Sequence, residues 1–106
     1  MARIETHCED CIRLLGKSFI EVHKWLDFYA KKYNPHVYLE YHRRFRHTDE
    51  ALSAQFENWS EEQQMAAKIH IVRDYEMYVL IKSFAEVKLD EIDDLFEKAK
   101  GVLHSF

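Results

Sequence analysis

Apolar residues recur every three or four positions along most of this chain, which is the spacing of a helix that buries one face. Such stripes predict five helices and no strand, at residues 6–15, 19–32, 35–58, 61–83 and 90–104. The fold class expected from this pattern is all-α, as a single bundle of four to five helices. The stripe nearest the C-terminus consists of Ile92, Leu95, Phe96, Ala99, Val102 and Leu103.

Short polar motifs indicate where most of these helices begin. In a capping box, a serine or threonine and a glutamate or glutamine three residues later satisfy free amides of the first turn. Asn34 followed by Pro35 indicates a further start, and Asp90 indicates another. The capping-box spacing occurs three times, at Thr6 with Glu9, Ser18 with Glu21, and Ser60 with Gln63.

The segment from 65 to 81 is the most apolar part of the chain. A helix that is apolar around most of its circumference belongs in the centre of a bundle, so we expect helix 61–83 there. His70 and Asp74 lie in this segment one turn apart and point to the same side of the helix. A carboxylate in that position needs a cation, a hydrogen-bond donor or a metal ion to offset its desolvation.

Length and composition limit the class of protein. The chain has 106 residues, 47% hydrophobic and 32% charged, with two glycines and one proline, which is the balance of one folded helical domain over residues 1–106. The net charge of −4 gives no electrostatic reason to expect nucleic acid as a partner. Neither a signal peptide nor a membrane span is expected from the sequence, and we therefore expect a cytoplasmic protein with reduced cysteines.

Three other segments carry side chains that could ligate a metal together with His70 and Asp74. A buried histidine paired with an aspartate four residues away is often only a core pair, and His23 and Asp27 could equally lie exposed beside their stripe. Recurrence in four segments of one bundle nevertheless favours a metal site. The other candidate ligands are His7 with Cys11, His23 with Asp27, and the cluster of His42, His47, Asp49 and Glu50.

His42 and His47 cannot both be assigned to one ion from the sequence. On an ideal helix they lie about 140° apart, so both could face one ion only if the helix kinks or a second subunit contributes. Helical geometry favours His42, which flanks the apolar stripe of its helix. His47 lies on roughly the opposite side.

Several named chemistries lack their motifs. The chain has no His-Glu-x-x-His, no Glu-x-x-His of di-iron bundles, no adjacent His-Asp pair of metal-dependent phosphohydrolases and no glycine-rich phosphate loop. Cys8 and Cys11 form a single Cys-x-x-Cys, without the second pair of a zinc ribbon or the βαβ pattern of a thioredoxin-like protein.

The order of these motifs resembles a family of small uncharacterised prokaryotic and phage proteins, a domain of unknown function. That family shows His-x-Trp-x-Asp, then His-Arg-x-x-Arg-His-x-x-Glu, then a histidine followed four residues later by aspartate. The corresponding stretches begin here at His23, His42 and His70, and the likeness covers about residues 7 to 74. It implies a shared site rather than an activity. Family members tend to have histidine where this chain has Cys11 and Thr48, and a glycine-rich insert between the last two motifs.

Imidazole, carboxylate and one thiolate together suit zinc best, with iron, manganese or nickel as alternatives. A site with an open position would activate water and indicate hydrolysis, whereas a closed site would be structural. In the hydrolase hypothesis, Glu50 or Asp27 is the general base. Arg43 and Arg46 then bind a phosphoester-like anion, although a solvated basic face paired with nearby acids explains these arginines as well.

The alternative hypothesis is a noncatalytic helical module, which includes a homodimer with core histidines or a structural metal. Aromatic residues dominate interface energies, so Trp25, Phe56 and Trp59 would be the anchors for a partner. Convergence of the ligand pairs around one point favours the metal-site hypothesis, and their dispersal over separate surfaces favours the interaction module.

Overall fold

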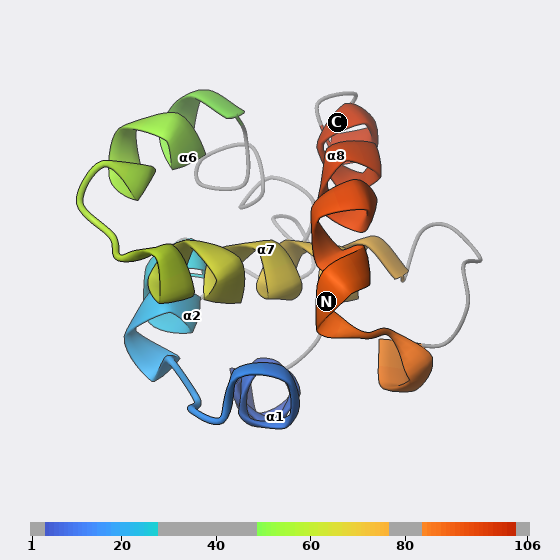
Figure 1. The fold of residues 1–106 in the computed structure, drawn as a ribbon. Coiled ribbons are helices and arrows are strands. Elements are labelled where there is room, and N and C mark those ends of the chain that lie inside the picture. Colours follow the sequence, from blue (N-terminus) through green and yellow to red (C-terminus); the bar gives the residue numbers. More distant parts are fainter. Residues whose placement is uncertain (1–3, 28–48, 77–83, 104–106) are drawn as a thin grey trace, which may run out of the picture.

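The computed structural model describes residues 4–27, 49–76 and 84–103. Within these ranges the chain forms helices and no strand, which confirms the all-α prediction. Two short 3-10 turns, Phe84–Glu86 and Leu89–Glu91, precede the last helix. The α-helices are α1 (Ile4–Leu15), α2 (Ile20–Leu26), α6 (Asp49–Phe56), α7 (Glu61–Glu76) and α8 (Ile92–Leu103), as Figure 1 shows.

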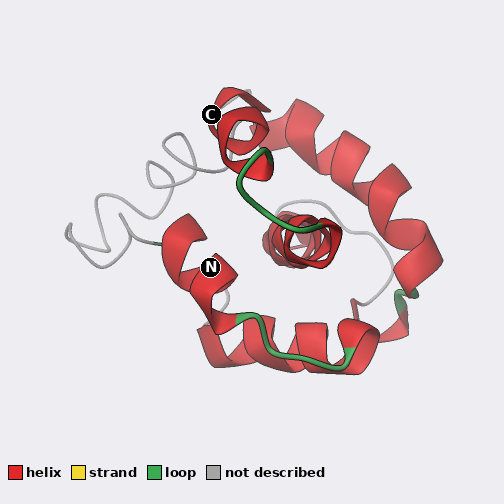
Figure 2. Ribbon diagram, turned by 60° about the vertical axis from the view of Figure 1, so that its left-hand side comes forward, coloured by secondary structure: helices red, strands yellow, loops and turns green. Residues whose placement is uncertain are grey.

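Helix α7 occupies the centre of the bundle, as its apolar circumference predicts. Figure 2 looks nearly along this helix, and the other helices stand around it. Its buried apolar side chains point to several sides and meet α1, α2 and α8. His70 and Asp74 are fully buried on the same helix. The buried apolar residues of α7 are Ala66, Ala67, Ile69, Ile71 and Val72.

The start of α7 agrees with the predicted capping box. The Ser60 amide donates to Gln63 Oε1 at 2.9 Å, and the Gln63 amide donates to Ser60 Oγ at 3.1 Å. Both side chains therefore satisfy amides of the first turn. The predicted start at Asp90 is two residues early, because a 3-10 turn covers that position and α8 begins at Ile92.

The other two predicted capping boxes are wrong. Helix α1 already begins at Ile4, so Thr6 lies inside it rather than at its start. Helix α2 begins at Ile20, and its N-cap is Phe19, which makes no side-chain capping bond. Phe19 has φ of 54° and Gly16 has φ of 85°, so the chain turns sharply between α1 and α2 through two left-handed residues.

Two arginines hold the C-terminal part of the chain against α1 and α7. Arg13 donates two hydrogen bonds of 2.8 Å to the carbonyls of Phe84 and Val87. The guanidinium of Arg73 lies 4.7 Å from the centroid of the buried Phe84 ring. It also donates from Nε and Nη2 to the two carboxylate oxygens of Asp10, at 2.7 Å each. This forked contact fixes how α1 crosses α7.

The three aromatics proposed as partner anchors pack within the molecule. Trp25 and Trp59 make an edge-to-face contact with centroids 5.3 Å apart, and Phe56 lies 6.1 Å from Trp59. All three are partly buried against the core. These contacts join the end of α6 and the turn after it to α2. None of the helices in the described ranges is long and apolar enough to cross a membrane.

Candidate metal centre

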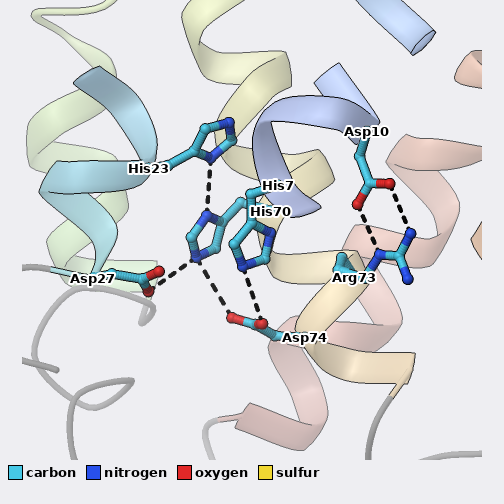
Figure 3. Close-up of polar contacts among 7 residues, drawn as sticks. All are labelled: His7, Asp10, His23, Asp27, His70, Arg73 and Asp74. Atoms are coloured by element: carbon cyan, nitrogen blue, oxygen red, sulfur yellow. Dashed lines mark hydrogen bonds and ion pairs between the residues drawn. The ribbon is translucent and has the colours of Figure 1, made fainter. Parts of the chain in front are cut away.

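Five potential metal ligands converge where α1, α2 and α7 meet. Figure 3 shows their side chains pointing toward one another from the three helices. Four of them are fully buried, and Asp27 is 4% exposed. The structure brings together both members of the His23–Asp27 and His70–Asp74 pairs, and His7 but not Cys11 of the first pair. The five residues are His7 from α1, His23 from α2, Asp27 at the C-cap of α2, and His70 and Asp74 from α7.

His70 lies at the middle of the cluster and uses both of its ring nitrogens. Its Nε2 is 3.2 Å from Asp27 Oδ1 and 3.5 Å from Asp74 Oδ2. Its Nδ1 is 3.0 Å from Nδ1 of His23. One edge of the His70 ring thus faces carboxylates, and the other faces a second imidazole.

His23 is also tied to the backbone of the turn before its own helix. Its Nε2 is 2.9 Å from the carbonyl oxygen of Ser18. That turn contains the left-handed Phe19, whose conformation places the Ser18 carbonyl beside the first turn of α2. The local turn thereby sets the orientation of the His23 ring.

His7 packs face to face on His70, with ring centroids 3.6 Å apart and planes inclined by 13°. Its Nε2 lies 3.4 Å from Asp74 Oδ1. Neither ring nitrogen of His7 has a hydrogen-bond partner within the described part of the chain. A fully buried imidazole in this state is unusual, because buried polar atoms are normally hydrogen-bonded.

Burial keeps His23 and His70 neutral. Desolvation, followed by the charges of His70 and His7, lowers the pKa of His23 from 6.5 to about 3. Desolvation and His7 lower the pKa of His70 to about 4, against the opposing effect of Asp27 and Asp74. A neutral imidazole has the free lone pair that a metal ion requires.

The donor atoms are close enough to share an ion. One group consists of His7, His23 and His70, and a second consists of Asp27, His70 and Asp74; in each, one atom per residue lies within 4.8 Å of the others. Both groups are buried, and His70 belongs to both. The cluster can therefore present imidazole nitrogens, carboxylate oxygens or a mixture of the two to one cation.

Cys11 is a predicted ligand that belongs to neither group. Its side chain is buried in the apolar core, with Sγ 4.0 Å from the carbonyl oxygen of Ala66. Desolvation, followed by the charges of Asp10 and Cys8, raises the pKa of the thiol to about 12. Cys11 is one turn farther along α1 than His7, and it meets α7 one turn before His70.

The remaining predicted site residues fall where the structure gives no side chain. His42, His47, Arg43 and Arg46 lie outside the described residues, so their predicted roles stay predictions. Glu50 lies in the first turn of α6, and its side chain is likewise not described.

One participant was not predicted from the sequence. The carbonyl of Ser18 contacts His23, and any residue type could supply that carbonyl, so no sequence motif marks it. The left-handed conformation of Phe19, which orients this carbonyl, could not be predicted either, because glycine and asparagine are the residues that commonly adopt it.

Comparison with protein-family models, curated proteins and solved structures found no match. The site must therefore be interpreted from its own geometry.

Proposed function

We propose that this protein binds one divalent metal ion, with zinc the preferred ion, at the cluster where α1, α2 and α7 meet. The observation that carries the proposal is the burial of five ligand-type side chains whose donor atoms form two groups of three, each within coordination reach and both containing His70. His23 and His70 are more than forty positions apart in the sequence, so only the folded chain brings the ligands together.

The two buried carboxylates of the cluster need a compensating charge. Burial of an ionised carboxylate is costly, and Asp27 and Asp74 both approach the same atom, Nε2 of the buried His70. A divalent cation at that point would balance two carboxylate charges and satisfy imidazole lone pairs at the same time. Metal binding thus supplies a common reason for the burial of both acids and the three histidines.

The chemistry of the donors limits the choice of ion. Imidazole nitrogens favour zinc, iron and nickel, whereas carboxylate oxygens also accept manganese. A mixed set without a thiolate suits zinc in four-coordination, with iron, manganese or nickel as alternatives. Cys11 is not needed in this set, because its protonated thiol lies against Ala66.

An ion held by these residues would join the three helices that supply them. Metal-dependent hydrolysis is the second candidate function, and it is favoured by the mixture of imidazole and carboxylate donors, which is typical of catalytic rather than structural zinc. In that case Asp27 or Glu50 would activate water, and Arg43 and Arg46 would bind a phosphoester-like anion. These roles are part of the proposal.

Calorimetric titration of zinc into chelator-treated protein tests the metal-binding proposal. The wild type should bind about one ion per chain, and Asp74→Asn should lose most of the affinity because a neutral amide is a poor ligand. Asp94→Asn, an exposed acid on α8, is the matched control and should bind as the wild type does. No heat of binding in a folded wild type, or equal binding by both variants, would contradict the proposal.

The hydrolase candidate needs its own assay. Zinc-loaded and manganese-loaded protein would be offered chromogenic phosphomonoesters and phosphodiesters, with Asp74→Asn as the inactive reference. Turnover by the wild type that Asp74→Asn abolishes would support hydrolysis. A metal-loaded wild type without turnover above Asp74→Asn would reject these substrates and favour an ion that serves the fold.

A further inference from the structure

The His70 ring has two nitrogens on opposite edges, and it can bind one metal ion through only one of them. On the Nδ1 edge lies His23, and on the Nε2 edge lie Asp27 and Asp74. His70 is the residue that the two donor groups of the cluster share. The hydrogen bonds around its ring distinguish between its two edges.

The carbonyl of Ser18 determines where the protons of the two rings lie. A carbonyl oxygen can only accept a hydrogen bond, so Nε2 of His23, 2.9 Å away, must carry the proton. In a neutral His23 ring, Nδ1 is then an acceptor. Nδ1 of His70, at 3.0 Å, must donate to it, which leaves the lone pair of a neutral His70 on Nε2.

That lone pair points at carboxylates. Nε2 of His70 faces Asp27 Oδ1 at 3.2 Å and Asp74 Oδ2 at 3.5 Å, so lone pairs face one another unless a proton or a metal ion lies between them. Hydrogen bonds from an imidazole to a carboxylate are usually shorter, about 2.7–2.9 Å. Donors that share an ion through bonds of about 2.1 Å lie roughly 3.0–3.4 Å apart, which is close to the spacing here.

His7 completes the same side of the site. Its Nε2 is 3.4 Å from Asp74 Oδ1. This distance again suits two ligand atoms of one metal ion better than it suits a hydrogen bond. Coordination would also explain why a fully buried imidazole has no hydrogen bond to a described residue. The stacked rings of His7 and His70 both direct Nε2 toward Asp74 (Figure 3).

We infer that the ion binds on the Nε2 side of His70 with Asp27, Asp74 and His7 as its other ligands, and that His23 is a positioning residue. Because the Ser18 carbonyl accepts from Nε2 of His23, Nδ1 of His23 accepts from Nδ1 of His70. This hydrogen bond holds His70 in the tautomer whose Nε2 is free to bind the metal. Outer hydrogen bonds of this kind orient ligating histidines in other metal sites. The inference rests on the proposed metal binding and specifies its ligands.

Long-range proton–nitrogen NMR of zinc-loaded, nitrogen-15-labelled wild type tests this assignment without any substitution. The expected spectrum shows His70 with a proton on Nδ1 and zinc on Nε2, and His23 with a proton on Nε2 and no zinc. Zinc on Nδ1 of His70 and of His23 would overturn the inference but leave the proposed function standing. Absence of zinc from a folded protein would reject the proposed function itself.

Two conservative variants give an independent reading. His23→Gln should lower zinc affinity about 10–100-fold without changing the stoichiometry, the usual effect of losing an outer partner. Asp27→Asn, at the C-cap of the same helix, should cost more because it removes a ligand. If His23→Gln loses binding entirely while Asp27→Asn loses only this modest factor, His23 is the ligand and the inference is wrong. Circular dichroism of each zinc-free variant checks that it folds.

Discussion

Zinc should stabilise the folded chain by an amount that mass action determines. The proposed ligands lie on three helices, with His7, Asp27 and Asp74 far apart in the sequence, so the unfolded chain cannot present them together. At a free zinc concentration one hundred times the dissociation constant, the free energy of unfolding should rise by about 2.7 kcal/mol. Each further tenfold increase should add about 1.4 kcal/mol.

The size of the chain converts this energy into a melting temperature. For 106 residues, the entropy of unfolding is roughly 0.22 kcal/mol/K, so 2.7 kcal/mol corresponds to a rise of roughly 12 °C. Far-ultraviolet circular dichroism would follow the melting of chelator-treated protein across a zinc series. The fluorescence of the packed pair Trp25 and Trp59 would provide a second probe of the same transition.

Asp74→Asn should melt at a temperature that zinc hardly changes, whereas Asp94→Asn should respond as the wild type does. The first substitution removes a buried donor, and the second alters an exposed acid on α8. A wild-type melting temperature that does not depend on zinc would refute the reasoning. So would an equal rise in Asp74→Asn, because the ion would then be binding elsewhere.

Three further perturbations test the packing and the electrostatics of the metal-free protein. The folded-state pKa values of His23 and His70 lie below 6.5, so the unfolded state binds more protons in acid. The free energy of unfolding should therefore be highest above about pH 6.5. Below that pH it should fall by up to about 1.4 kcal/mol per pH unit for each histidine. Urea unfolding at a series of pH values measures this, and a flat profile down to about pH 5 would contradict it. Phe84→Ala should cost about 3–5 kcal/mol because it empties a fully buried site beneath Arg73, and a loss below about 1 kcal/mol would show that the ring is not part of the core. Arg73→Met should cost about 1.5–3 kcal/mol by leaving the Asp10 carboxylate without its forked donor, and a double-mutant cycle with Asp10→Asn would show no coupling if that contact is absent in solution.

Within the described residues, periodicity was sufficient to predict helical structure and to identify the central helix. The apolar circumference of α7 identified the central helix, and the stripe of α8 placed Ile92, Phe96 and Ala99 in the core, where they are found. These predictions succeeded because burial of apolar surface is the main determinant of which face a helix presents.

Helix starts were less predictable. The Ser60–Gln63 pair forms its capping box, but Ser18 with the same spacing does not cap α2, because the chain needs a sharp left-handed turn at Phe19. Tertiary packing of α2 against α1 and α7 overrides the local motif there. A capping motif stabilises a helix start by about 1 kcal/mol, and tertiary packing can contribute more than that.

The sequence identified the five members of the cluster but not their arrangement. Helical spacing placed His70 beside Asp74 and His23 beside Asp27, yet it gave no indication that Asp27 would approach His70 or that His7 would stack on it. Those contacts depend on how α1 and α2 cross α7. Cys11 shows the limit of the spacing argument, because it shares a helical face with His7 and still packs into the apolar core.

Elemental analysis of tag-free protein, purified without added metal or chelator, tests the central claim most directly. We expect about one zinc, iron, manganese or nickel ion per wild-type chain and almost none in Asp27→Asn and Asp74→Asn, with Asp94→Asn unchanged. A folded wild type without metal, which also takes up none on dialysis against zinc, would contradict the account. The buried histidines and aspartates would then be a hydrogen-bonded part of the core.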